Sequence, residues 1–89
     1  MHLAASERVI LELLSAHGAC FGLQLVAGSR KRLTRGGIYV TLGRMEQKGL
    51  VRSKPGEGAR RLYEPTALGL KSLIAHQIIE GNLPLGAGI

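Results

Sequence analysis

Basic side chains are the groups in this sequence that could do chemistry, and they gather in the middle of the chain. Residues 30–48 carry six Lys or Arg against one Glu, a net of +5, and residues 51–63 carry four against one, a net of +3. The flanking segments, 1–29 and 64–89, each carry a net of −1. Clustered cations bind phosphates and are typical of proteins that bind nucleic acid. A surface that is only soluble needs no such clustering.

Other kinds of site chemistry have little support in the sequence. The histidines His2, His17 and His76 lie far apart and lack the ligand spacing of a zinc site. Cys20 is interpreted as a small buried apolar residue. No glycine-rich phosphate loop follows a predicted strand, and no paired carboxylates suit acid–base catalysis. We therefore expect no enzymatic activity, no metal and no cofactor.

The size and composition favour one small globular domain. The chain has 89 residues, 45% of them hydrophobic, with a net charge of +6 and a pI near 10.3. A domain this short buries little surface, and such domains often gain stability by dimerising. No apolar run is long enough to span a membrane, Glu7 and Glu12 interrupt the only candidate for a signal peptide, and a single Cys fits a reducing compartment. We expect a cytoplasmic protein.

Three helices are predicted in the first half of the chain. Ser6 is expected to cap a first helix that stops at Gly18, and a second, shorter helix is expected from about 21 to 27. Thr34 is expected to cap a third helix that ends at Gly49. This order predicts a helix-turn-helix.

A β-hairpin and a fourth helix are predicted to follow. Residues 51–63 contain Pro55, Gly56 and Gly58 between two short extended runs, which indicates a hairpin with basic strands. Thr66 is expected to cap a helix that runs to about residue 80. The predicted fold is therefore mostly α with a small β-hairpin, a winged helix-turn-helix. It comprises three helices, a two-stranded wing and a C-terminal helix in residues 1–80, with a flexible tail at 81–89.

The third helix, within TRGGIYVTLGRMEQKGL, is unusually rich in glycine. Ile38, Leu42 and Met45 share the face predicted to pack inward, whereas Gly36 and Gly43 fall on the outward side with Val40 and Gln47. Each glycine inside a helix costs about 1 kcal/mol relative to alanine. We interpret the bare outward face as one that approaches a DNA backbone closely. Amides at 36 and 37 are expected to face a phosphate.

Two motifs in the chain resemble the PadR family of winged-helix transcriptional regulators. GGIYVTLGRMEQKGLV matches a family pattern at Gly36, Ile38, Tyr39, Leu42, Arg44, Glu46, Gly49, Leu50 and Val51. RRLYEPTALG matches a second pattern at Arg60, Arg61, Tyr63, Thr66 and Gly69. The resemblance covers roughly residues 8 to 75, and it implies a homodimer that binds DNA and usually represses transcription.

The chain departs from the family pattern at several positions. Gly37 replaces the usual Thr or Ser and so lacks a hydroxyl for a phosphate, and Val40 replaces a frequent Pro. Met45 replaces Leu, a tolerable core change. Phe21 and Leu23 stand where relatives often carry Tyr.

Double-stranded DNA is the predicted partner. The residues expected to hold phosphates or face bases are Arg32, Thr34, Arg35, Gly36, Gly37, Tyr39, Val40, Arg44, Gln47, Lys54, Arg60 and Arg61. Within this set, Val40, Arg44 and Gln47 are the ones expected to read bases, so base readout should be modest and the backbone contribution large. Tyr39 could instead only pack its ring within the domain.

The fourth helix is predicted to pair with a second copy of the chain. Leu68, Ala75 and Ile79 lie on one face, and apolar residues cover much of the other. Two apolar stripes imply two partners, the domain core and another chain. The residues expected in the homodimer interface are Leu70, Leu73, Ile74, Gln77 and Ile78.

Two other classes of function stay open at this point. The fold could serve as a protein-interaction module whose smooth glycine face binds another protein. It could also be a small-molecule sensor with a ligand at the dimer interface, although the 3% aromatic content argues against a planar aromatic ligand. The sequence names no effector.

Overall fold

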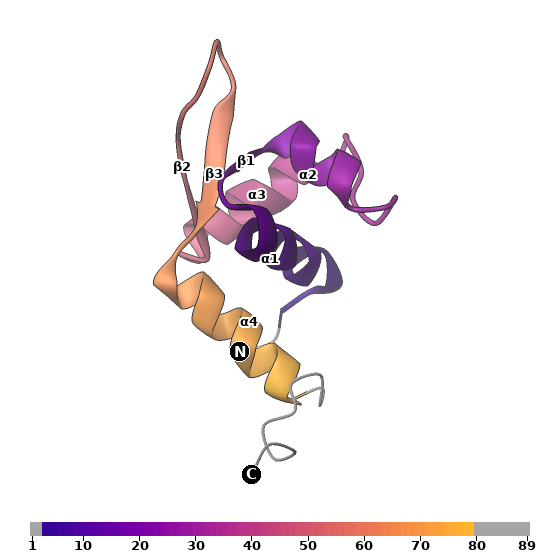
Figure 1. Cartoon of the computed structure of the whole chain (residues 1–89), viewed down its shortest axis with the longest axis vertical. Helices are drawn as coiled ribbons and strands as arrows, with labels where there is room; N and C mark the ends of the chain where they lie inside the picture. The colour runs from indigo at the N-terminus through magenta and orange to yellow at the C-terminus, as the bar shows by residue number, and fades with distance from the viewer. Residues whose placement is uncertain (1–2, 80–89) are drawn as a thin grey trace.

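The computed structural model of the chain describes residues 3–79, which fold into four helices and a small sheet (Figure 1). The elements in chain order are α1 (Ala5–His17), β1 (Cys20–Phe21), α2 (Gly22–Gly28), α3 (Ile38–Gln47), β2 (Val51–Pro55), β3 (Arg61–Pro65) and α4 (Ala67–Ile79). The winged helix-turn-helix prediction is confirmed. The predicted tail at 81–89, and the predicted helix end near residue 80, lie outside the described residues.

The sheet has three strands rather than the two that were predicted. Its order is β1-β3-β2 and both pairings are antiparallel, with Cys20 opposite Tyr63 and Phe21 opposite Leu62. A strand of two residues shows no alternation of apolar and polar side chains, so the pattern along the sequence could not reveal it. β1 fastens the start of α2 to the wing, the hairpin formed by β2 and β3.

The core is mostly aliphatic. The inward faces of α1, α2 and α3 supply most of its side chains, and β2, β3 and α4 add Val51, Tyr63 and Leu73. The predicted inward face of α3 is confirmed, because Ile38, Leu42 and Met45 are all at most 1% exposed. Burial of such side chains contributes about 1.5–3 kcal/mol each. The remaining fully buried large side chains are Ile10, Leu11, Leu14, Leu25, Leu50 and Val51.

The start of α1 differs from the prediction that Ser6 caps it. The helix begins at Ala5, so Ser6 lies inside it. The Glu7 carboxylate instead accepts a hydrogen bond from the Ala4 amide at 2.9 Å. A glutamate that reaches back by three residues satisfies an otherwise unpaired amide at the helix start, and a serine cap is not needed.

The start of α3 is also later than predicted, so only Gly43 of the three glycines lies inside the helix. Thr34 does act as a cap, but of the preceding turn: its Oγ1 accepts a hydrogen bond from the Gly37 amide at 3.0 Å. The prediction that Gly36 and Gly37 belong to the helix is therefore wrong. The Gly37 amide already has a partner inside the chain, which contradicts its expected exposure to a phosphate.

One glycine that permits close packing of the backbone lies in α4 rather than in α3. A Cβ built on Gly69 would lie 2.1 Å from the Leu50 carbonyl oxygen, so α4 crosses the α3–β2 connection at backbone distance. Thr66 caps this helix as predicted, because its Oγ1 accepts from the Gly69 amide at 3.0 Å and donates to the Gly49 carbonyl. Both contacts tie the start of α4 to the end of α3.

Candidate nucleic-acid interface

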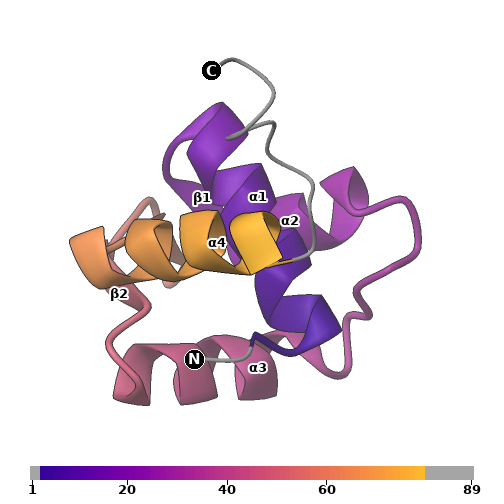
Figure 2. The same cartoon turned by 90° about the horizontal axis from the view of Figure 1, so that it is seen from below.

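The outward side of α3 is open along its length. Val40 is 56% exposed, a Cβ at Gly43 would meet nothing within 4 Å, and Arg44 and Gln47 are exposed as well. Figure 2 shows α3 along one edge of the molecule, with the other helices on its inner side. The structure thus leaves exposed the three side chains that were expected to face bases.

Tyr39 joins α3 to α2 and has only one side turned to solvent. It is 52% exposed, and its ring packs so closely on the start of α2 that a Cβ at Gly22 would lie 2.7 Å from ring atom Cε1. The two interpretations of Tyr39, packing and contact with a phosphate, are therefore compatible. The ring packs between the two helices, and half of the residue remains open to a partner.

A buried carboxylate fixes the other flank of α3. Glu7 is 4% exposed, and its Oε2 accepts a hydrogen bond from Lys48 Nζ at 2.7 Å. Burial raises the pKa of Glu7, but bonds from Lys48 and the Ala4 amide, with the charges of Lys48 and Arg44, outweigh it and leave the pKa lowered. This ion pair joins α1 to the end of α3, and it places Arg44 in the field of a buried anion.

The loop between α2 and α3, residues 29–37, carries cations without counter-charges. Within residues 3–79 no carboxylate lies within ion-pair distance of any of its basic side chains, which are Arg30, Lys31, Arg32 and Arg35. Ser29 braces the loop from inside, because its buried hydroxyl donates to the Val26 carbonyl and accepts from the Leu33 amide at 3.0 Å. These bonds tie the first part of the loop to the end of α2.

Two of these loop cations occupy an unusual backbone conformation. Arg30 has φ 54° and Lys31 has φ 69°, the left-handed region that glycine adopts most readily. For other residues this region costs roughly 1–2 kcal/mol each. Sites where such strain persists are often sites of function, so the pair is a further candidate for contact with phosphates.

The wing also carries four cations, but each has a partner within the chain. Arg52 Nε lies 2.8 Å from the Glu64 carboxylate, which also lies 3.9 Å from Lys54 Nζ. The bond from Arg52 is the main reason that the pKa of Glu64 is lowered. Arg60 lies 3.9 Å from Glu57, at the exposed wing tip. The wing's charge is thus partly compensated before any ligand arrives.

A chain of hydrogen bonds connects the base of the wing to α3. Ser53 of β2 donates from its hydroxyl to Glu46 of α3 at 2.8 Å and accepts from Arg61 Nε of β3 at 2.9 Å. Tyr63 is buried beside this group, and burial together with the Glu46 charge raises the pKa of its phenol. Arg61 therefore helps to hold the wing against α3 through Ser53, and its side chain remains exposed.

Some residues of this surface were not among the predicted site residues. Arg30, Lys31 and Arg52 belong to the same basic segments and could have been included on charge alone. Glu7, Glu46 and Ser53 support the surface from other elements. No signal in the sequence pairs Glu7 with Lys48, which lies 41 positions later.

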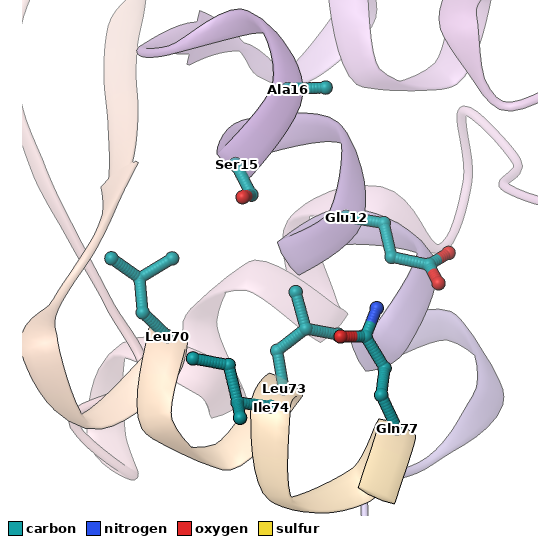
Figure 3. A pocket seen from close by; sticks show the side chains of 7 residues that line it. All are labelled: Glu12, Ser15, Ala16, Leu70, Leu73, Ile74 and Gln77. Atoms are coloured by element: carbon teal, nitrogen blue, oxygen red, sulfur yellow. The ribbon is translucent and has the colours of Figure 1, made fainter. Parts of the chain in front are cut away.

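A second feature lies on the opposite side of the core, between α1 and α4. A groove of about 580 Å³ is lined by Glu12, Ser15, Ala16, Leu70, Leu73, Ile74 and Gln77. Figure 3 shows the side chains of the two helices gathered around it. Four of the five residues predicted for a dimer interface line this groove. The fifth, Ile78, is 42% exposed further along α4.

The face of α4 that packs inward differs from both predicted stripes. Gly69, Ser72, Leu73 and His76 are its buried residues. Leu73, at 5% exposed, therefore belongs mainly to the core, which corrects its assignment as a residue free to contact a partner. Ile74, by contrast, is 49% exposed.

Within residues 3–79, no group of three or more His, Cys, Asp or Glu side chains is placed to hold a metal ion. In the same part of the chain, no helix is both long enough and apolar enough to cross a membrane.

No protein-family model matches the chain, and no curated protein matches it in sequence. Solved structures with the same fold do exist. Transcriptional regulator PA4135 superposes with a TM-score of 0.76 over 90% of this chain at 22% identity, and MepR does so at 0.76 over 98% at 19% identity. MepR is a transcription regulator of the Staphylococcus aureus multidrug efflux pump MepA.

A third structure was solved with DNA bound. The M. tuberculosis transcriptional regulator MOSR, in complex with DNA, superposes with a TM-score of 0.71 over 93% of this chain at 23% identity. The chain spans 60%, 66% and 62% of the lengths of these three structures. Their likeness establishes that the chain has the winged-helix fold that these regulators share.

Proposed function

We propose that the chain binds duplex DNA and acts as a transcriptional regulator. One observation carries the proposal: the open outward side of α3 lies between two groups of cations. The loop 29–37 precedes α3 and the wing follows it, so the two groups lie at opposite ends of the helix (Figures 1 and 2). A helix flanked in this way can enter the major groove while both ends hold phosphates.

The contacts divide into those that position the protein and those that read sequence. Arg32, Thr34 and Arg35 in the loop, with Gly36 and Tyr39 beside them, would contact one stretch of backbone. Lys54, Arg60 and Arg61 would contact another. The free face of α3 offers Arg44 for guanine, Gln47 for adenine and Val40 for a thymine methyl group. With so few side chains able to read bases, binding should depend strongly on salt and only modestly on sequence.

The regulatory part of the proposal draws on two supports. The structures that share the fold are named as transcriptional regulators, one of them bound to DNA. The two sequence motifs resemble those of PadR regulators, which usually repress transcription. A repressor of this kind would work in the cytoplasm and would have no catalytic activity.

A single substitution on α3 tests DNA binding directly. Gly43→Glu places a bulky anion in open space on the outward side, and glutamate suits a helix better than glycine, so the fold should persist. Affinity for a duplex, measured by fluorescence anisotropy at low salt, should fall by at least about tenfold. Ala75→Glu adds the same charge on the exposed side of α4 and should change affinity little. Equal effects of the two variants, or no binding by the unaltered chain, would refute the proposal.

We also propose that the chain forms a homodimer through α4. Of the exposed large apolar side chains, most lie on this one helix: Leu68, Leu70, Ile74, Ile78 and Ile79. Leu70, Ile74 and Ile78 recur at helical spacing, and the first two line the groove against α1. Covering such a stripe with a second copy would remove apolar surface from water, and a dimer would double the phosphate contacts.

The dimer is tested by one charge on the stripe. Ile74→Glu should convert the dimer to a monomer in sedimentation equilibrium, because a carboxylate would have to be buried without a partner. Ala75→Glu, one residue away and off the stripe, serves as the matched control and should leave the dimer intact. A monomeric unaltered chain at high concentration would contradict this part of the proposal.

A further inference from the structure

The aromatic ring of Phe21 touches the wing from outside it. Phe21 ends β1 and immediately precedes α2, and its backbone amide donates to the Gln24 side chain at 2.8 Å. Its ring lies under Arg60, whose guanidinium carbon is 4.4 Å from the ring centroid. A residue of the helix-turn-helix thus contacts a cation that the proposed function places on DNA.

The same ring closes on the turn of the wing. A Cβ added to Gly56 would lie 2.6 Å from Phe21 Cε1, so only glycine leaves room for the ring there. Gly56 also donates its amide to the Arg60 carbonyl at 2.8 Å, which closes the turn. The ring therefore contacts both the backbone that forms the turn and the side chain that leaves it.

The contact with the Phe21 ring orients the Arg60 side chain more strongly than its ion pair does. Its carboxylate neighbour, Glu57, is 91% exposed at 3.9 Å, a pair that water screens and that contributes little. A guanidinium over an aromatic face is attracted by the ring even at an exposed site. The flat ring also limits the directions in which the side chain can extend.

We infer that Phe21 is a positioning residue that sets the wing, and Arg60 in particular, relative to the recognition helix α3. The inference rests on the proposed DNA binding for its role, but the contact itself can be tested without DNA. Phe21 would act through Arg60 rather than touch DNA.

The first experiment measures wing motion in the free protein. Phe21→Leu keeps an apolar side chain but removes the aromatic face, and Gly56→Ala displaces the ring without altering Phe21. Both should lower the ¹⁵N heteronuclear NOE of the turn amides Gly58 and Arg60. Leu23→Ala, at an exposed position in α2, should not. Unchanged values in both test variants would overturn the inference whether or not the protein binds DNA.

The second experiment asks whether Phe21 and Arg60 act as one unit on DNA. Phe21→Leu should weaken binding to a duplex by about two- to fivefold, the equivalent of an exposed cation–π contact. The same change in an Arg60→Ala background should have no further effect, because the side chain that it orients is gone. In an Arg61→Ala background it should weaken binding by the full factor. An equal decrease in all three backgrounds would mean that Phe21 supports the fold only, and would overturn the positioning role.

The two experiments separate this inference from the proposed function. If the unaltered chain fails to bind duplex DNA, the DNA-binding proposal fails with it, and the NOE measurement alone then decides whether Phe21 holds the wing. If the chain binds DNA but the two residues show no coupling, DNA binding stands and the positioning role is wrong.

Discussion

The loop 29–37 and the wing 51–65 carry four basic side chains each, yet they differ in what surrounds those charges. The loop contains no acidic residue, whereas the wing contains Glu57 and Glu64, so their net charges are +4 and +2. In the loop no side chain forms an ion pair within residues 3–79, whereas in the wing Arg52, Lys54 and Arg60 do. Equal numbers of cations therefore offer unequal electrostatic potential to a polyanion.

The difference points to separate tasks for the two regions. A cation without a counter-charge attracts phosphate at long range and contributes fully to the salt dependence of binding. A cation beside a carboxylate offers less net charge, and one in contact with a carboxylate, a hydroxyl or a ring has a more defined direction. We expect the loop to supply most of the charge-dependent affinity and the wing to supply geometry.

The largest expected effect comes from removing matched pairs of cations. Lys31→Ala/Arg32→Ala in the loop should lower the slope of log affinity against log salt by about 1.8, at about 0.9 for each phosphate that the variant no longer neutralises. Arg60→Ala/Arg61→Ala in the wing should lower it by less, because Glu57 and Glu64 already reduce the net charge of the wing. Fluorescence anisotropy across a salt series measures both slopes. A larger change of slope in the Arg60→Ala/Arg61→Ala variant would mean that the wing, and not the loop, supplies most of the charge-dependent affinity.

The next effect concerns the ion pair between Glu7 and Lys48, which joins α1 to the end of α3. The pKa of Glu7 is lowered in the folded chain, so its carboxylate stabilises the fold above the unfolded-state pKa of about 4.3. That contribution disappears as the pH falls through the lower, folded-state pKa. Lys48→Ala should lower the free energy of unfolding at pH 7 by about 1–2 kcal/mol, since it leaves a buried carboxylate without its cation.

Urea denaturation at neutral and acidic pH measures this effect. The difference in stability between the unaltered chain and Lys48→Ala should shrink as the pH falls through the lowered folded-state pKa, where Glu7 becomes protonated. A difference that stays constant from pH 7 to about pH 3 would show that Lys48 stabilises α3 by some means other than its charge.

A smaller effect is expected from two substitutions at Lys31 that distinguish backbone strain in the loop from the charge of its side chains. Lys31→Gly and Lys31→Ala remove the same cation, but at φ 69° glycine fits the backbone without steric cost. The glycine variant should be more stable than the alanine variant by about 1 kcal/mol in urea denaturation. Their DNA affinities should fall equally. If the alanine variant were as stable, the left-handed conformation at this position would not be a source of strain.

The smallest effect is a gain in affinity from the wing. Glu64→Gln frees Arg52 and Lys54 from their shared carboxylate, so binding to a duplex should tighten by about two- to fivefold at low salt, the range set by an exposed ion pair. Glu57→Gln, next to the more distant Arg60, should change affinity less. Weaker binding by Glu64→Gln would indicate that the ion pair orients Arg52 productively and would remove part of the contrast between the two regions.

Helical periodicity and local turn residues were sufficient to predict most of the fold. The inward face of α3, the wing turn and the cap at Thr66 follow from residues a few positions apart, so each has a local physical cause. The predicted start of α3 was wrong because Thr34 caps a turn that precedes the helix. β1 was missed because two residues become a strand only when β3 lies beside them.

The sequence by itself determined the kind of surface: an open helix flanked by basic segments. Charge and periodicity are properties of neighbouring residues, and they can be read without knowledge of the fold. Only the tertiary structure decided which charges remain available. Glu64 lies beside Arg52, Glu7 beside Lys48, and Phe21 beneath Arg60, contacts between residues 12, 41 and 39 positions apart. Pairing at such separations depends on how the elements pack, so counting cations along the chain could not distinguish the loop from the wing.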